Sequence, residues 1–274
     1  MEWRFLNTGV NTGAMNMAID EAVLINHAEG LVPPTLRFYT WEPSAVTLGY
    51  FQSLEKEIDI QGCKQVGVDY VRRLTGGRAV LHDRDFTYSV IVVEDNPLIP
   101  KGILESYKEL SRGIIRGLDL LGVKAEVVAL ADDTNKGKKK DLSVACFDSP
   151  SWYEVVIDGK KIVGSAQTRR EGVLLQHGSI LLNLDIDKLF TALKTPSEKV
   201  KERIVKDFPN RAISLDTVLG RTVVYEDLIQ VMQEGFAEAL GIKLLPGELT
   251  PQEVQLAKQL EQEKYASLEW NTRK

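Results

Sequence analysis

Cysteine and histidine are both scarce in this chain, which has two cysteines and three histidines among 274 residues. The cysteines, Cys63 and Cys146, lie far apart and match no metal-ligand spacing, so we expect no bound metal. A chain of this length can bury a large core without disulfides or a structural metal. Unpaired thiols are typical of a reducing compartment, and we therefore expect a cytoplasmic protein.

Long apolar runs and an excess of positive charge are also lacking. No apolar run approaches the roughly 18 residues that a membrane helix needs, and the stretch from Met1 to Phe5 lacks a signal peptide's apolar core, so we expect no membrane association. The net charge of −5 argues against non-specific nucleic-acid binding, which needs a basic surface. No Walker-type loop is present, and no Gly-x-Gly-x-x-Gly follows a strand, so neither common nucleotide-binding loop is predicted.

The order of the predicted elements indicates an α/β (α+β) fold. Strand-like runs cluster between residues 34 and 183, with helical patterns before, within and after them. Hairpin signals such as Asp158-Gly159 favour a mixed, largely antiparallel sheet flanked by helices over a doubly wound parallel sheet. We expect one large domain over residues 1–245, with its core at about 33–245, and a helical appendage over 246–274.

A glycine pair between two strand-like runs is the most unusual stretch of the sequence. Gly76 and Gly77 are accompanied by three arginines and a histidine, namely Arg72, Arg73, Arg78 and His82. Paired glycines allow the backbone to approach a ligand closely, and neighbouring N–H groups and guanidinium groups favour an anion or a carbonyl oxygen. The alternative is an ordinary hairpin turn whose arginines face water.

A second candidate site combines a thiol and a lysine. Cys146 follows a lysine-rich stretch, residues 136–140, and Lys161 begins a predicted strand just beyond the Asp158-Gly159 turn. A thiol near a cation can act as a nucleophile, because the cation stabilises the thiolate that attacks. The alternatives are that Cys146 is buried and inert and that Lys161 is solvated. His177 is interpreted as a core histidine on a strand.

These stretches resemble the signature of the lipoate-protein ligase and octanoyltransferase superfamily. The segment from Arg72 to Asp83 resembles its glycine-rich motif, and Gly159 to Gln167, which contains Lys161, Gly164 and Ser165, is similar to its lysine motif. Cys146 and the residues after it are most similar to octanoyltransferases of the LipM type. The resemblance extends over nearly the whole chain and implies the catalytic-domain fold shared with biotin protein ligases.

The resemblance implies transfer of an octanoyl group from acyl carrier protein to a lysine of a lipoyl domain, with the glycine-cleavage H protein as the expected acceptor. Cys146 is implied to hold the octanoyl group as a thioester, and Lys161 to lower the pKa of the thiol and polarise the carbonyl. The glycine pair, Arg72, Arg73, Arg78, His82, Gly164 and Ser165 are implied to bind substrate. No cofactor is expected, and the lysines of residues 136–140 are predicted to contact the acidic carrier protein.

Two departures weaken the expectation of a nucleotide site. Arg78 stands where ATP-dependent ligases of the superfamily carry a third glycine, and Arg84-Asp85 replace their Gly-Asn. Three alternatives to octanoyl transfer from a carrier protein remain at this point. They are an amidotransferase acting between lipoyl domains, an ATP-dependent lipoate ligase, and a non-catalytic module that binds lipoate or acylated partners.

Overall fold

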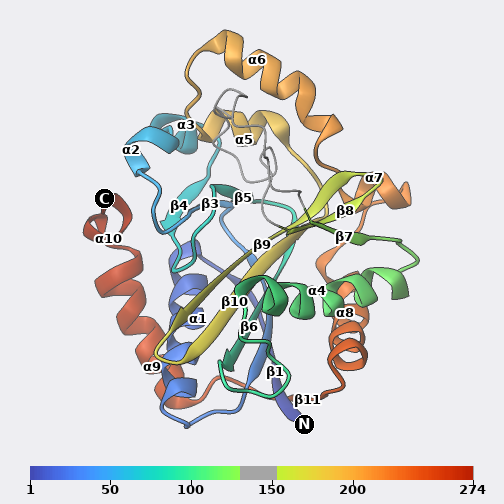
Figure 1. The fold of residues 1–274 in the computed structure, drawn as a ribbon. Coiled ribbons are helices and arrows are strands. Elements are labelled where there is room, and N and C mark those ends of the chain that lie inside the picture. Colours follow the sequence, from blue (N-terminus) through green and yellow to red (C-terminus); the bar gives the residue numbers. More distant parts are fainter. Residues whose placement is uncertain (130–152, 274) are drawn as a thin grey trace.

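The computed structural model describes residues 1–129 and 153–273. Cys146 and the lysine run of residues 136–140 lie outside these described residues. Two sheets are present in the described part of the chain, and helices cover both faces of the larger one (Figure 1).

The larger sheet has eight strands in the order β11-β1-β2-β6-β10-β9-β8-β7. Only the β11–β1 and β1–β2 pairs are parallel, and the other pairs are antiparallel, which confirms the prediction of a mixed, largely antiparallel sheet. The strands are β1 Glu2–Asn11, β2 Thr35–Trp41, β6 Asp85–Val93, β7 Glu126–Ala129, β8 Tyr153–Ile157, β9 Lys160–Arg170, β10 Val173–Leu181 and β11 Lys243–Pro246.

The smaller sheet contains the strands on either side of the glycine pair. Its order is β4-β3-β5, where β4 is Asp69–Arg72, β3 is Ala45–Leu48 and β5 is Val80–His82. The glycine pair lies between β4 and β5, and each of these strands pairs with β3. The next strand, β6, belongs to the larger sheet. The alternative of a simple two-stranded hairpin is therefore wrong, because the strands before and after the turn do not pair with each other.

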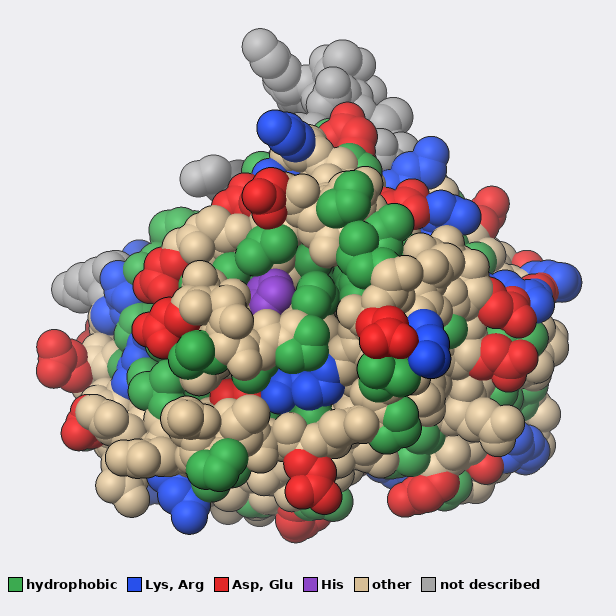
Figure 2. Space-filling model, turned by 90° about the horizontal axis from the view of Figure 1, so that it is seen from below, with side chains coloured by type: hydrophobic (Ala, Val, Ile, Leu, Met, Phe, Trp, Pro, Cys, Tyr) green, Lys and Arg blue, Asp and Glu red, His purple; other side chains and the backbone are tan. Residues whose placement is uncertain are grey.

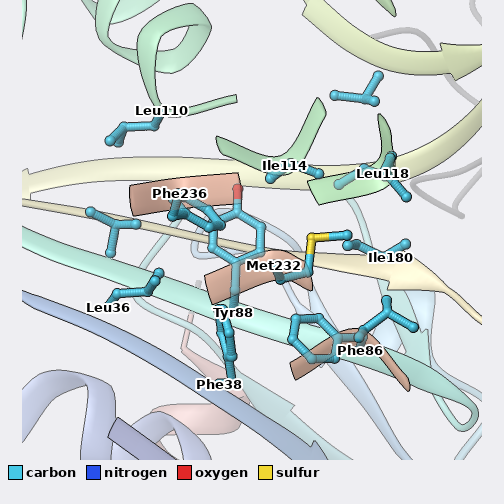
Figure 3. Packing of buried hydrophobic residues seen from close by; sticks show 14 of the residues in the cluster. Leu36, Phe38, Phe86, Tyr88, Leu110, Ile114, Leu118, Ile180, Met232 and Phe236 are labelled. Atoms are coloured by element: carbon cyan, nitrogen blue, oxygen red, sulfur yellow. The ribbon is translucent and has the colours of Figure 1, made fainter. Parts of the chain in front are cut away.

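Helices α4 and α8 cover one face of the large sheet with an apolar core (Figure 3). Side chains of β2 and β6 alternate, so Phe38, Phe86 and Tyr88 point toward these helices. The two helices approach closely because glycines meet at their crossing; a Cβ on Gly235 would lie 2.3 Å from the Gly117 backbone nitrogen. The helices of the described residues are α1 Gly13–Ala28, α2 Leu54–Glu57, α3 Ile60–Gln65, α4 Ile103–Leu120, α5 Ile186–Ala192, α6 Glu198–Asp207, α7 Leu215–Leu219, α8 Tyr225–Leu240, α9 Pro251–Leu260 and α10 Leu268–Thr272, together with the 3₁₀ helix η2 Phe208–Asn210 and the π-helix η3 Glu261–Tyr265.

Helix α1 covers the opposite face of the large sheet, and α9 and η3 pack against α1 in a second apolar cluster. Thr12 caps α1 by accepting a hydrogen bond from the Met15 N–H, as expected for a residue of this type before a helix. Strand β11 spans the predicted domain boundary at 245 and pairs with β1. The division of the chain at that boundary stays a prediction.

The end of the molecule that carries the N-terminus shows acidic and basic side chains interspersed over its surface (Figure 2). No described helix is both long enough and apolar enough to pass through a membrane. Residues of both sheets and of α1 together line a cavity.

Candidate active site

A cavity of about 260 Å³ lies where the two sheets meet. Both sequence motifs contribute to it, since Gly77 and Arg78 come from the glycine-rich turn and Gly164 and Ser165 come from β9. Strands β2, β3, β5, β6 and β10 and helix α1 supply the remaining wall. The lining residues are Met17, Tyr39, Trp41, Thr47, Arg73, Gly77, Arg78, Val80, His82, Thr87, Gly164, Ser165, Ala166, His177, Gly178 and Ser179.

Arg73 is buried and organises the glycine-rich turn. Its Nη2 atom donates to the carbonyl oxygens of Gly76 at 2.7 Å and Arg78 at 2.8 Å. Its Nε atom donates to the Thr75 hydroxyl at 3.0 Å, and its Nη1 atom donates to the Thr47 hydroxyl at 3.0 Å. The alternative in which the motif arginines face water is therefore wrong for Arg73, which is 4% exposed.

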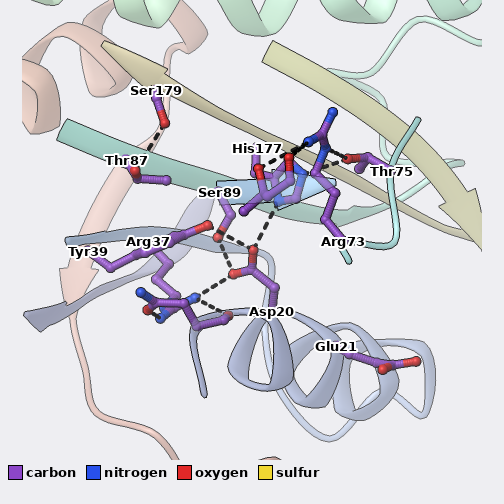
Figure 4. A network of polar contacts seen from close by, with 12 residues as sticks. Asp20, Glu21, Arg37, Tyr39, Arg73, Thr75, Thr87, Ser89, His177 and Ser179 are labelled. Atoms are coloured by element: carbon purple, nitrogen blue, oxygen red, sulfur yellow. Dashed lines mark hydrogen bonds and ion pairs between the residues drawn. The ribbon is translucent and has the colours of Figure 1, made fainter. Parts of the chain in front are cut away.

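His177 links the glycine-rich turn to a buried carboxylate (Figure 4). Its Nδ1 atom lies 3.2 Å from Asp20 Oδ2, and its Nε2 atom lies 2.7 Å from the Thr75 hydroxyl. Burial alone would raise the pKa of Asp20, yet the charge of Arg37 and the contacts of His177 and Ser89 together lower that pKa. Burial lowers the pKa of His177, although Asp20 acts in the opposite direction. The pair is therefore a carboxylate and a neutral imidazole near neutral pH.

Asp20 belongs to α1 and is fully hydrogen-bonded. Its Oδ1 atom accepts from Arg37 Nη1 at 2.6 Å and from the Ser89 hydroxyl at 2.8 Å. Its Oδ2 atom accepts from the Tyr39 hydroxyl at 3.1 Å and also contacts His177. A buried carboxylate with this many donors is held in one orientation, so it can orient the histidine that it contacts.

His82, another lining residue of the cavity, has a similar set of contacts. Its Nδ1 atom lies 2.6 Å from Asp85 Oδ2, and its Nε2 atom lies 3.0 Å from the Thr47 hydroxyl. The ring stacks on Trp41 with the ring centroids 4.0 Å apart. Asp85 Oδ1 is buried and has no hydrogen-bond partner among the described residues. The sequence placed His82 at the site, and the structure places it in the cavity wall.

Arg72 points away from the cavity although it adjoins Arg73. Its guanidinium group is fully buried and, among the described residues, donates only to backbone carbonyl groups. These carbonyl groups belong to the loop after β3, residues 49–52, and to the C-terminal residues 270–273. The structure thus separates Arg72 from the residues that line the cavity, whereas Arg73 and Arg78 are among them.

Lys161 is buried at the start of β9, where only 3% of the residue is exposed. Its Nζ atom lies 2.8 Å from Glu154 Oε1, so the alternative of a solvated lysine is wrong. Lys161 is not among the cavity-lining residues, but it precedes Gly164 and Ser165 on the same strand. Because Cys146 lies outside the described residues, the predicted pairing of this thiol with Lys161 stays a prediction.

The other cysteine, Cys63, is an unreactive residue of the core. It is buried, and burial together with nearby carboxylates raises the pKa of its thiol to about 11. Within residues 1–129 and 153–273, no group of three histidine, cysteine or acidic side chains is arranged to hold a metal ion.

Several residues of the site were missed by sequence reasoning. Asp20, Thr47 and Thr75 were not singled out, and His177 was interpreted only as a core histidine. Asp20 did carry a usable signal, because it is an acidic residue among the apolar positions of the helix that contains it. Its partner could not be identified, because His177 is 157 residues further along the chain.

Comparison with known proteins gives consistent results over the whole chain. The lipoyl protein ligase A/B catalytic domain matches residues 12–237. A protein named octanoyltransferase LipM from Brevibacillus brevis is 49% identical over 274 residues, covering 100% of this chain and 99% of the relative. Another protein of that name, from Bacillus subtilis, is 44% identical over 270 residues, covering 98% of this chain and 97% of the relative.

Solved structures of similar proteins share the fold. A bipartite lipoate protein ligase from Thermoplasma acidophilum, studied with its E2 lipoyl domain, matches with a TM-score of 0.81 and 30% identity, covering 99% of this chain and 96% of that one. A lipoate-protein ligase A bound with ATP matches with a TM-score of 0.80 and 29% identity, covering 99% of each chain.

Proposed function

The chain belongs to the lipoyl protein ligase A/B catalytic domain family and is an acyltransferase, and on that premise we propose that it is an octanoyltransferase of protein lipoylation. The donor is octanoyl-acyl carrier protein, and the acceptor is a lysine of a lipoyl domain, preferably that of the glycine-cleavage H protein. The observation that carries the proposal is the cavity, in which Gly77 meets Gly164 and Ser165 in a chain that matches octanoyltransferases over its full length.

The first half of the reaction loads the enzyme. The Cys146 thiolate attacks the carbonyl carbon of the octanoyl thioester, and a carbon–sulfur bond to Sγ forms. The bond to the donor's sulfur breaks, and the carrier protein leaves as a thiolate that takes up a proton. The cavity wall around Gly77 binds the acyl chain and the carbonyl group during this step.

The second half transfers the octanoyl group to the acceptor. The lysine amine attacks the Cys146 thioester carbonyl, an amide bond forms, the amine loses a proton, and Sγ leaves as a thiolate. Division into two steps means that the two protein substrates never need to occupy the site together. Neither step needs ATP or a metal ion, because the donor is already a thioester.

Lys161 stabilises the Cys146 thiolate by its positive charge and polarises the thioester carbonyl. Lys161 lies on β9, the strand whose Gly164 and Ser165 line the cavity. Its buried ion pair with Glu154 of β8 supports this role, because the pair holds the ammonium group in one position. An exposed lysine could point in many directions, whereas a buried lysine is held in one.

An intact-mass experiment tests the proposal. Purified enzyme is incubated with octanoyl-acyl carrier protein without ATP, and then with apo H protein. We expect the enzyme to gain the mass of one octanoyl group and the H protein to gain it in turn. Cys146→Ala is expected to abolish the adduct, and Cys63→Ala, which removes the buried thiol, is expected to retain it.

Other results would contradict the proposal. Normal turnover by Cys146→Ala would exclude the covalent intermediate. Activity only with free lipoate and ATP would favour the ligase alternative, for which the fold likeness to an ATP-bound lipoate-protein ligase is the supporting observation. Activity only with an octanoylated H protein as donor would identify an amidotransferase.

A further inference from the structure

Arg73 holds the glycine-rich turn from one side, and this fixes the direction of a backbone donor. Its guanidinium group binds the carbonyl oxygen of Gly76 through both Nη2 and Nε, at 2.7 and 3.2 Å. In a planar trans peptide unit the N–H group points opposite to the carbonyl group. The N–H of Gly77, which belongs to the same peptide unit as the Gly76 carbonyl group, therefore points away from the Arg73 guanidinium.

The Gly77 N–H is a donor without an acceptor in the described part of the chain. Gly77 itself lines the cavity. Its φ of +92° is open to glycine and strained for other residues, and a Cβ at this position would lie 2.8 Å from Arg73 Nη2. The turn thus keeps an unsatisfied N–H group at the wall of a site that receives a carbonyl group.

The orientation of Arg73 depends in turn on a chain of buried hydrogen bonds (Figure 4). A carboxylate only accepts, so Asp20 requires a proton on His177 Nδ1. The neutral ring then accepts at Nε2 from the Thr75 hydroxyl, which in turn accepts from Arg73 Nε. Every proton in this chain has one possible position, so the chain runs in a fixed direction from α1 to the turn.

We propose that Asp20 and His177, acting through Thr75, are positioning residues that hold Arg73, and with it the Gly77 N–H, in the orientation that binds the carbonyl oxygen of the octanoyl thioester. This inference rests on the octanoyl transfer proposed above. Negative charge develops on that oxygen when the thiolate attacks, and a donor that is already oriented stabilises it without rearrangement. Asp20 and His177 act on the reaction although they do not touch the carbonyl oxygen.

Thr75 is the best position at which to break this chain. Replacing Asp20 would also remove the counter-ion of the buried Arg37, and the loss of fold would obscure the result. Thr75→Val keeps a side chain of similar shape and removes the hydroxyl, whereas Thr75→Ser keeps the hydroxyl. The two variants therefore differ in the hydrogen-bond link between His177 and Arg73.

The test measures the single-turnover rate of Cys146 acylation by octanoyl-acyl carrier protein at saturation. We expect Thr75→Val to lower this rate roughly 10- to 100-fold with a change in KM of less than about twofold, because the carbonyl donor is misplaced while the acyl chain still binds. Thr75→Ser is expected to stay within about threefold of the wild-type rate, because its hydroxyl can still join the two neighbours.

A second buried histidine provides the control for general destabilisation. His27 bridges the Val32 carbonyl group and the Val93 N–H at the far end of α1, and it does not line the cavity. We expect His27→Gln to lower the melting temperature without changing the acylation rate. A Thr75→Val protein that is folded and acylated at the wild-type rate would overturn the positioning role.

A measurement that does not depend on turnover separates this inference from the proposed function. The backbone amide signal of Gly77 is followed by NMR in ¹⁵N-labelled wild type, Thr75→Val and Thr75→Ser. We expect a shift in Thr75→Val and near-identity in Thr75→Ser. If the wild type accepts no octanoyl group, the proposed function fails, and the positioning of the Gly77 N–H is then judged from its amide signal alone. A shift confined to Thr75→Val supports the positioning role, and an unchanged signal overturns it.

Discussion

Two neighbouring arginines of one motif have different surroundings. Arg73 binds the glycine-rich turn and borders the cavity, whereas Arg72 binds carbonyl groups of the loop after β3 and of the C-terminal residues. The difference follows from the alternation of side chains along an extended segment, which sends successive residues to opposite sides. The sequence identified both arginines from their motif, but it could not assign the two directions, since each depends on segments that approach only in the fold.

The buried ion pair of Lys161 gives a prediction at the scale of a single residue. Replacing Glu154 by Gln removes the carboxylate that pairs with the buried Lys161 ammonium group, and we expect the free energy of unfolding to fall by roughly 3 kcal/mol in urea titrations. As a matched control, Glu2→Gln breaks the exposed pair with Lys243 and should leave the urea midpoint nearly unchanged. Equal midpoints for Glu154→Gln and wild type would contradict this account.

At the scale of elements, the most regular parts of the chain were predicted well. The helical pattern expected before the strand-like cluster is α1, and the cluster expected between residues 34 and 183 contains every described strand except β1 and β11. Within that cluster, β6 is buried along most of its length from Asp85 to Val93. Strand β11 was missed because its four residues are mostly exposed and alternate weakly, so that pairing with β1, rather than local pattern, determines it.

The crossing of α4 and α8 gives a prediction at this scale. Replacing Gly235 by Ala places a Cβ 2.3 Å from the Gly117 backbone nitrogen, where no side chain can move aside. We expect the helices to separate and the protein to lose roughly 1–3 kcal/mol of unfolding free energy, as measured by urea titration. Glu234→Ala, on the exposed side of α8, is the control for helix propensity and should cost little. A Gly235→Ala protein as stable as wild type would show that the crossing has room to adjust.

At the scale of the whole molecule, fold class could be predicted but the cavity could not. Hairpin signals and element order are local, and they indicated a largely antiparallel sheet, as found. The cavity arises where the small sheet meets the large one, and it brings together Met17 of α1, Gly77 of the turn and Gly178 of β10. No local pattern encodes that meeting, which depends on how the two sheets pack.

Histidine protonation makes the stability of the whole domain depend on pH. Burial lowers the pKa of His27 and of His177 below the usual value of 6.5, so both rings are neutral in the folded protein near pH 7. The unfolded chain takes up these protons at a higher pH than the folded chain does. Their contribution to stability is therefore present above about pH 6.5 and is lost as pH falls through the folded-state pKa.

This dependence can be measured by melting curves between pH 7.5 and 5. We expect the wild-type melting temperature to fall over this range, and His27→Gln to start lower but fall less steeply, because one of the two protonation events has been removed. Parallel curves for the two proteins would mean that His27 does not contribute to the acid sensitivity.

The carbonyl groups that surround Arg72 come from residues as distant as Gly49 and Arg273. During translation, a ribosome must therefore synthesise the chain beyond residue 273 before this guanidinium group can contact all of these acceptors. Until then the Arg72 guanidinium group has to stay hydrated, although it adjoins the segment that forms the glycine-rich turn. The environment of Arg72 is thus completed only after residues 270–273 have been synthesised, and a product that stopped before them would lack these acceptors next to the glycine-rich turn.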